Sequence, residues 1–264
     1  MKLKYAKLNW LLTAFIFIGI TLLLSNSVEL RSVMGASDDP VTLFQMAESG
    51  QAEAALDIVS ASAAQIGGWG AAPGDEIVFD PSLARGIRAS ILVIDLPPGE
   101  CSLPKLARNR QECVDDYTAK QNQIRFGRSM FSTADEQGNR QPRPVFDDLL
   151  STYIEEMGHS WQEYLYETEG RGVGPRNILT SWEEGNYWAH GWEYQVKMYV
   201  LSLDGRWLFL SVAERTELKS NICTGYANTE HYYIPAYSAP PGWPNPEGWP
   251  TTKPSSEALQ DFCE

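Results

Sequence analysis

Two glutamates and a histidine near the middle of the chain have the types and the spacing needed for metal binding or proton transfer. They lie in the stretch 147–167, which reads DDLLSTYIEEMGHSWQEYLYE. On an α-helix, at about 100° per residue, Glu155 and His159 fall next to each other, with Glu156 and Glu163 beside them. Carboxylates and an imidazole within one helical turn can bind a divalent cation or move a proton.

The helix that would carry these groups is predicted from its apolar periodicity. Asp147 and Asp148 suit a cap and a first turn, and Gly170 or Gly172 could end the helix. An exposed surface helix would show the same pattern, with a solvated Glu–His pair worth only about 0.2–0.5 kcal/mol. The apolar stripe recurs at three- and four-residue steps and consists of Leu150, Tyr153, Ile154, Met157, Trp161, Tyr164 and Leu165.

The window 155–162, EEMGHSWQ, resembles the active-site helix of the zincin metallopeptidases. Their motif is His-Glu-x-x-His, often with Gly before the second His and Trp-Gln after it. The resemblance makes Glu156 the general base and His159 the second metal ligand. Glu155 stands where the family has its first His, so it would act as an oxygen ligand and give a harder site than zinc usually has.

The resemblance implies an α+β fold in which a small sheet packs on the site helix and a second, downstream helix supplies the third ligand. A helix is predicted over Tyr187–Leu203, and Glu193 lies at the edge of its apolar stripe, half buried and able to point at a neighbouring helix. Glu193 is therefore the first candidate for the third ligand. The other candidates, in order, are His190 and then Glu183 or Glu184.

For activity, the resemblance implies one divalent metal ion, zinc first, held by Glu155, His159 and Glu193, and a peptide or protein substrate. Two carboxylates beside a single imidazole lower the Lewis acidity of a bound metal and disfavour a bound water with a pKa near 7. The expected protein is a degenerate zincin relative with weak or absent peptide hydrolysis. The alternative is a non-catalytic extracellular protein that uses the same scaffold for binding or structure. Gly158 costs roughly 1 kcal/mol inside a helix, which predicts the close approach of another backbone, such as a sheet strand.

The remaining elements are predicted from composition and periodicity. Thr42–Ile66 is predicted to contain helix with a break at Gly50, and Glu76–Phe79 is predicted to be a strand. Ile87–Leu96 is predicted to be a strand buried on both faces because of its continuous apolar run. Gln123–Phe131 reads as a further strand, and Asp135–Pro144 as a polar loop. Trp207–Lys219 is predicted to be a buried helix or a strand leading into one.

The N-terminus predicts export. Three lysines precede Leu8–Leu24, a run without charged residues, so residues 1–27 are a cleaved signal peptide or a membrane anchor. In both cases the basic flank stays inside and the rest is extracytoplasmic, either anchored or secreted. Residues 28–40 read as a connector to a domain over 41–231.

The charge balance restricts the partners. The formal net charge of the 264-residue chain is -13, which argues against nucleic acid and against docking on anionic lipid. Contact with a membrane is therefore expected only through the N-terminal helix, if it is uncleaved.

Four cysteines without a Cys-x-x-Cys motif suit disulfides in an oxidising compartment. Of the three pairings, Cys101–Cys113 with Cys223–Cys263 is favoured, because the first closes a short loop and the second fastens the C-terminal tail. Residues 232–264 form that tail, which is rich in proline and tryptophan. It is expected to be extended and to pack its rings on the domain, with an aromatic sugar-stacking surface as the alternative.

Other chemistries fit less well. The Gly-rich loop at 67–70 lacks the Gly-Lys-Ser/Thr of a phosphate loop. A di-iron carboxylate site would need a second Glu-x-x-His, and a serine hydrolase would need Gly-x-Ser-x-Gly; the sequence contains neither. A glycosidase using a carboxylate pair stays open, because the sequence gives no separation between carboxylates.

Overall fold

The computed structural model describes residues 38–92, 123–135, 137–169, 182–226 and 238–264. Asp39–Glu264 forms one compact unit of mixed α+β structure with two small sheets and, among the described residues, six α-helices. The predicted N-terminal segment 1–27, most of the connector and the pair Cys101–Cys113 lie outside the described residues. Among the helices that are described, none has the length and the apolar character to cross a membrane.

Two helices open the described chain, as their alanine-rich sequence predicts. Asp39 caps the first of them, since its carboxylate accepts hydrogen bonds from the backbone N–H groups of Val41 and Thr42. The break falls at Gly50, whose positive φ of 89° is readily adopted only by glycine. The helices are α2 (Pro40–Glu48) and α3 (Ala52–Gly67).

The main sheet has three strands in the order β1-β3-β2. Its central strand pairs in parallel with β1, where Ile77 faces Ile124, and antiparallel with β2, where Ile91 faces Ile124. The second sheet is the hairpin of β4 and β5, in which Ser132 faces Pro142. The strands are β1 (Glu76–Phe79), β2 (Ala89–Leu92), β3 (Gln123–Phe126), β4 (Ser132–Ala134) and β5 (Arg140–Pro142).

Two strand predictions and one loop prediction need correction. The strand expected over Gln123–Phe131 ends at Phe126 and continues as a 3₁₀ turn, η2 (Arg128–Phe131). The polar loop predicted at Asp135–Pro144 contributes β5 to a hairpin. β2 was expected to be buried on both faces, but it is the edge strand of its sheet, and Ile91 is partly exposed.

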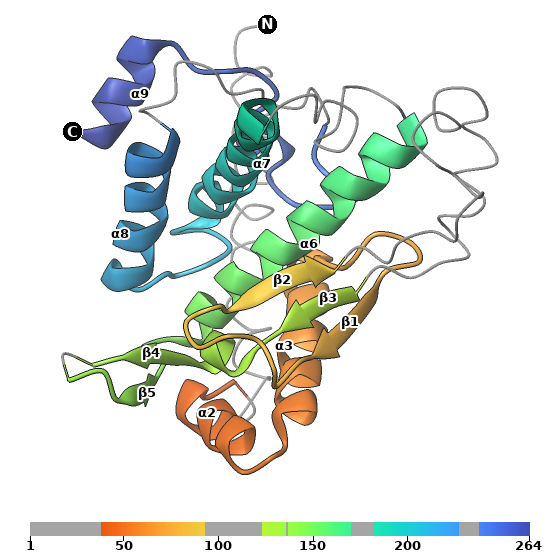
Figure 1. Ribbon diagram of the computed structural model, residues 1–264, viewed down its shortest axis with the longest axis vertical. Helices are drawn as coiled ribbons and strands as arrows, with labels where there is room; N and C mark the ends of the chain where they lie inside the picture. Colours follow the sequence, from red (N-terminus) through yellow and green to blue (C-terminus); the bar gives the residue numbers. More distant parts are fainter. Residues whose placement is uncertain (1–37, 93–122, 136, 170–181, 227–237) are drawn as a thin grey trace, which may run out of the picture. The chain divides into compact units, whose positions relative to one another are not determined.

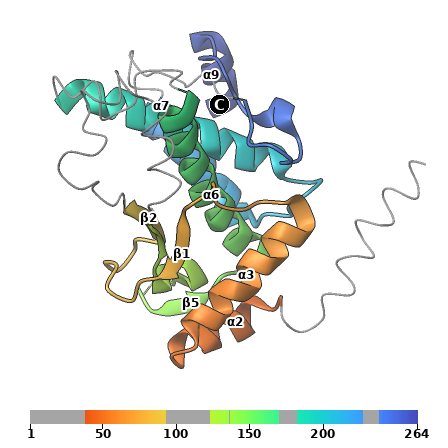
Figure 2. The ribbon, with the colours of Figure 1, turned by 90° about the vertical axis from the view of Figure 1, so that its right-hand side faces the viewer.

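The long helix α6 (Phe146–Glu169) lies between the sheet and α7 (Trp182–Leu203) (Figures 1 and 2). The predicted stripes of both helices form the core, with Tyr153, Met157, Val196 and Tyr199 almost completely buried. The polar side of α6 is covered as well, since Ser151 and Gln162 are fully buried. The interpretation of α6 as an exposed surface helix is therefore wrong.

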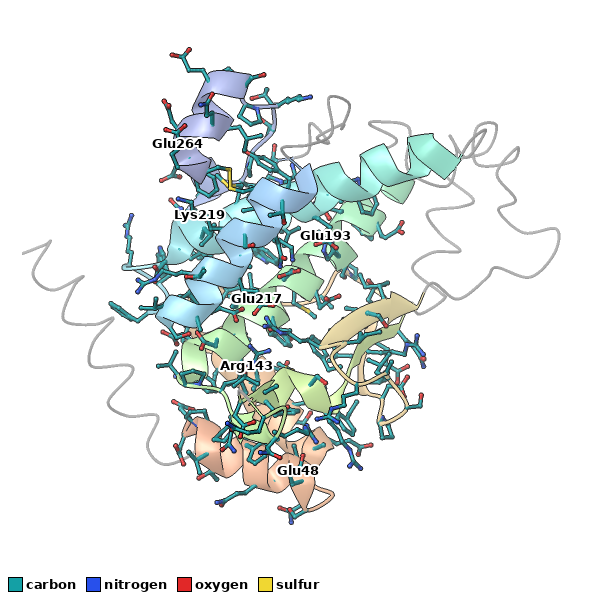
Figure 3. All side chains as sticks on the ribbon, turned by 60° about the vertical axis from the view of Figure 1, so that its left-hand side comes forward. Glu48, Arg143, Glu193, Glu217, Lys219 and Glu264 are labelled. Carbon is teal, nitrogen blue, oxygen red and sulfur yellow. A yellow bond between two sulfur atoms is a disulfide. The ribbon has the colours of Figure 1, made fainter. Side chains whose placement is uncertain are left out.

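The C-terminal region is built around α8 (Val212–Asn221), which Ser211 caps by accepting a hydrogen bond from Glu214 N–H. The predicted Cys223–Cys263 disulfide is present, closing a separation of 40 residues and joining the π-turn η3 (Ile222–Tyr226) to α9 (Ser256–Cys263) (Figure 3). This part of the tail is therefore helical, whereas an extended chain was expected.

The tail also supplies tryptophans to the core, as predicted. Trp243 and Trp249 are almost completely buried, and each packs its ring against Tyr199 on α7 with centroids 5.5 Å and 5.3 Å apart. The hydroxyl of Tyr199 donates to Pro244 O and accepts from the indole N–H of Trp69. The described part of the tail and the preceding domain thus share one core.

Candidate metal site

Glu155 and His159 on α6 meet Glu193 on α7, and one ligand atom from each lies within 4.8 Å of the other two. Residues that are 34 positions apart in the sequence meet because the apolar stripes of the two helices pack against each other. His159 Nε2 lies 3.5 Å from Glu193 Oε1. That distance is close to the separation of about 3.3 Å expected for two ligands on one zinc ion with bonds of about 2.0–2.2 Å. The three side chains that the zincin resemblance selects could therefore hold a metal ion.

The imidazole of His159 is oriented by a chain of amides. Gln162 donates from Nε2 to Trp192 O and to Gln195 Oε1, so its own Oε1 accepts from His159 Nδ1 at 2.8 Å. This bond leaves His159 Nε2 buried and facing the two glutamates, where its contact with Glu193 is an ion pair without hydrogen-bond geometry. A metal-ligating histidine usually has such a hydrogen bond on the ring nitrogen that does not bind the metal.

A lysine lies between the two carboxylates. Lys197, which is 8% exposed, forms an ion pair with Glu155, and its Nζ is 3.1 Å from Glu193 Oε2. An ammonium group therefore contacts both oxygen ligands of the candidate site. Lys197 was not among the residues predicted from the sequence, although it lies four residues after Glu193, a spacing that places both side chains on one face of a helix.

Glu156, the predicted general base, lines a cleft of about 280 Å³ together with Glu155, Glu193 and Lys197. Burial raises the pKa of Glu156 to about 7, against the opposing effect of the charge on His159. A carboxyl group with a pKa near neutrality is suited to accept and return a proton. The side chains of His190, Glu183 and Glu184, the other candidates for the third ligand, lie outside the described residues.

The charges of the cluster shift the other two titrations in opposite directions. Burial alone would lower the pKa of His159, but Glu193, Glu156 and Glu155 outweigh it and raise that pKa to about 9. Burial would raise the pKa of Glu193, but His159 and Lys197 hold it far below its usual value. Without a metal, the site consists of an imidazolium and an ammonium group against two carboxylates.

The raised pKa of His159 predicts a loss of stability at alkaline pH in metal-free protein. Because the folded pKa of about 9 exceeds the unfolded value of about 6.5, the contribution is complete below pH 6.5 and disappears as the pH rises through 9. Between pH 7.5 and 9.5 the free energy of unfolding should fall by roughly 1–2 kcal/mol in urea titrations with EDTA. In His159→Gln the fall over that window should be smaller by this amount; equal slopes would contradict the prediction.

Gly158 allows the close approach of α7. A Cβ at this position would lie 2.8 Å from Val196 Cγ1 and 3.5 Å from the Trp249 ring. The predicted close approach of another backbone, such as a sheet strand, is therefore wrong: the nearest atoms belong to side chains of α7 and of the C-terminal tail.

Gly158→Ala is accordingly expected to destabilise the protein by about 1–3 kcal/mol through overpacking, although alanine is the better helix former. The clash depends on the branched side chain of Val196. In a Val196→Ala background the same substitution should therefore be neutral or stabilising. Urea unfolding of the four proteins of this double-mutant cycle checks the prediction, and additive effects would refute it.

Comparison with known proteins does not assign the chain to a family: no protein-family model matches it, and neither does any curated protein or solved structure.

Proposed function

We propose that this chain is an exported, zincin-like protein that binds one divalent cation and has weak or absent peptide-hydrolysing activity. Zinc is the first candidate for that cation. The metal ligands are Glu155, His159 and Glu193, and Glu156 is the proton acceptor beside them. The observation that carries the proposal is the convergence of these three ligand groups from two packed helices.

The fit of a metal ion is supported by the donor set and by one buried atom. Two carboxylates and one imidazole are accepted by zinc and by other first-row divalent ions. His159 Nε2 is buried and lies 3.5 Å from Glu193 Oε1, an ion-pair contact whose geometry does not make a hydrogen bond. A cation coordinated there would satisfy that nitrogen.

The zincin-like scaffold is supported by the arrangement of elements around the site. The helix with the Glu-Glu-x-x-His sequence contacts a small sheet on one side and a downstream helix with an acidic ligand on the other. A bound divalent ion would polarise a peptide carbonyl and lower the pKa of a coordinated water. Glu156 lies in the same cleft, where its raised pKa would let it hold the proton that such chemistry releases.

Lys197 is the reason for expecting weak activity. Its ammonium group is paired with both carboxylate ligands, so a divalent ion must compete with a positive charge that belongs to the protein. Two anionic ligands also lower the Lewis acidity of any ion that binds. Efficient hydrolysis would require Lys197 to leave the site.

A second candidate function is supported by the same lysine. The ammonium group of Lys197 neutralises the carboxylates as a structural metal ion would. The two helices can therefore pack stably without a bound metal. The protein would then be a non-catalytic extracellular binding or structural protein. Export itself is supported by the charge-free run 8–24 after three lysines and by the Cys223–Cys263 disulfide.

Metal analysis separates the two candidates. Protein purified without chelator should contain about one equivalent of a divalent metal by elemental mass spectrometry, and His159→Ala should lose it. A screen with casein and with short unstructured peptides then tests hydrolysis, with Glu156→Gln as the control that keeps the ligands. No metal in the wild type, even after dialysis against micromolar Zn²⁺, would reject the metal site and favour the non-catalytic function.

A further inference from the structure

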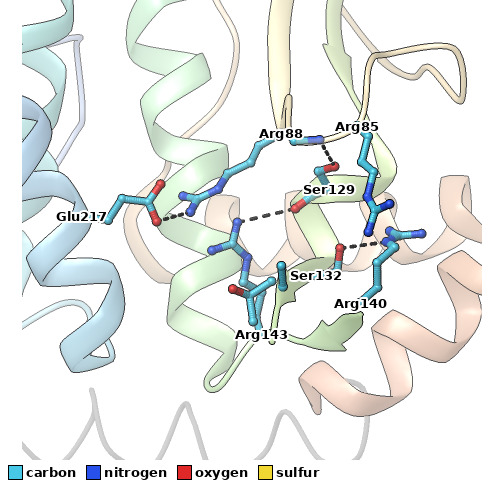
Figure 4. A pocket seen from close by; sticks show the side chains of 10 residues that line it. Arg85, Arg88, Ser129, Ser132, Arg140, Arg143 and Glu217 are labelled. Carbon is cyan, nitrogen blue, oxygen red and sulfur yellow. Dashed lines mark hydrogen bonds and ion pairs between the residues drawn. The ribbon is translucent and has the colours of Figure 1, made fainter. Parts of the chain in front are cut away.

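Four arginines meet in a second cavity, which lies beside the metal cleft. We call it the arginine pocket and define it by Arg85, Arg88, Arg140 and Arg143, with a volume of about 210 Å³. The hydroxyl groups of Ser129 and Ser132 also line it (Figure 4). Such a concentration of positive charge is unusual in a chain with a net charge of -13.

Separate elements bring the four side chains together. Arg85 and Arg88 come from the loop that leads into β2, Arg140 from β5, and Arg143 from the turn before α6. The serines lie in and directly after η2, where Ser129 Oγ accepts a hydrogen bond from Gly86 N–H. The pocket is therefore built from both sheets and the start of the long helix.

The left half of the pocket in Figure 4 is nearly balanced in charge. Arg88 and Arg143 both donate to the buried carboxylate of Glu214, and Arg88 also pairs with Glu217. These contacts account for the two arginines as structural ion pairs.

The right half keeps an excess of positive charge. Arg140 pairs with Glu48 and donates to Ser132 Oγ at 3.1 Å. Arg85 donates to a neutral acceptor, Gly138 O, and no carboxylate among the described residues forms an ion pair with it. Arg85 is exposed, so its guanidinium N–H groups are accessible from the solvent.

The guanidinium groups form two neighbouring pairs in Figure 4, Arg85 with Arg140 and Arg88 with Arg143. Within the second pair, Arg88 is directed at Glu217 and Arg143 at the backbone oxygen of Ser129. Burial, and next the charge of Arg88, lower the pKa of Arg143, as expected for cations crowded into one cavity. An anion between the two pairs would relieve this repulsion.

We propose that the arginine pocket binds a phosphoryl group, either as free phosphate or as the terminal group of a phosphate monoester. Guanidinium groups form paired hydrogen bonds to phosphate oxygens, and donors on opposite walls match a tetrahedral group with several acceptors. The cavity is smaller than the range of about 300–1,000 Å³ typical of drug-sized ligands, so it fits a phosphoryl group and leaves the rest of a monoester outside. The site is independent of the metal proposal, although Arg88 lines both cavities.

Binding can be measured on the purified full chain by isothermal titration calorimetry and thermal unfolding. The probes are sodium phosphate, O-phosphoserine as a monoester, and sodium chloride at matched ionic strength. Phosphate is expected to bind with a Kd below about 1 mM and to raise the Tm by several degrees, whereas chloride leaves it unchanged. O-phosphoserine binding at least as tightly as phosphate would identify a monoester ligand, and preference for phosphate would identify the free ion. Absence of binding by both probes would overturn the proposal.

Charge variants test the location. Arg85→Gln and Arg140→Gln should each weaken phosphate binding at least about fivefold. Arg215→Gln is the matched control, because it removes a positive charge from an exposed residue of α8 that pairs with Asp204 outside the pocket. The Tm without phosphate reports folding, and Arg85→Gln should leave it unchanged because Arg85 is exposed. Wild-type affinity in either pocket variant, or an equal loss in Arg215→Gln, would overturn the proposal.

Discussion

Lys197→Met is expected to raise the Zn²⁺ affinity of the Glu155–His159–Glu193 site by at least about 100-fold. The ammonium group lies 3.1 Å from Glu193 Oε2 and also pairs with Glu155, so a divalent ion in the wild type meets a cation at its two oxygen ligands. At an effective dielectric constant of about 20, two unit charges 4 Å apart interact with about 4 kcal/mol, and removing part of that repulsion suffices for the expected gain. Methionine keeps most of the length and the apolar stem of the side chain.

The measurement is a competition titration with a chromophoric zinc chelator at constant pH, because metal affinity depends on ligand protonation. Lys219→Met is the control: it makes the same substitution at a lysine that packs 5.5 Å from the Phe262 ring. In EDTA, Lys197→Met should be less stable than the wild type, because two partly buried carboxylates lose their partner, and Zn²⁺ should restore its Tm. Adding His159→Ala should cancel the gain in affinity. Equal zinc affinity of the wild type and Lys197→Met would show that the lysine does not compete with metal.

Glu214→Ala is expected to lower the free energy of unfolding by about 3–5 kcal/mol, the usual cost of breaking a buried ion pair. Glu214 is 2% exposed and accepts hydrogen bonds from Arg88, Arg143 and Ser151. Burial raises the pKa of Glu214, and the two arginines oppose this shift. Without its carboxylate, the buried guanidinium of Arg143 loses its ion-pair partner among the described residues.

Glu217→Ala provides the matched comparison on the same helix. Glu217 also pairs with Arg88, at 2.5 Å, but about half of its side chain is exposed. Exposed ion pairs contribute at most about 1 kcal/mol, so this substitution should cost less than that. Urea unfolding of both variants at pH 7 measures the two losses in the free energy of unfolding. Similar losses for the two substitutions would contradict the role assigned to burial.

Periodicity predicted the helices that carry the candidate site, because both apolar stripes are buried against each other. The apolar stripe of α7 also predicted that Glu193 would lie at its edge, half buried and directed at a neighbouring helix. In the structure Glu193 has this position and faces α6. The Cys223–Cys263 pairing was predicted because it fastens the C-terminal tail. Helix periodicity depends on local sequence, which a single chain records.

Other parts of the site depend on contacts between distant segments and were not predicted. Lys197 has the spacing of an ordinary helical ion pair to Glu193, and only the packing of α7 on α6 brings it to Glu155. Gln162 was recognised only as part of the zincin-like motif, and its position between His159 and Gln195 was not predicted. The predicted end of β3 was wrong, because η2 continues the apolar pattern of that strand.

The hydrogen bond from Gln195 to Pro250 O, together with the packing of Trp249 beside Gly158, links the orientation of His159 to the state of the cysteines. The amide chain that orients His159 ends on a carbonyl that lies inside the loop closed by the Cys223–Cys263 disulfide. Reduction of that disulfide would therefore loosen the support of His159, although neither cysteine belongs to the candidate site.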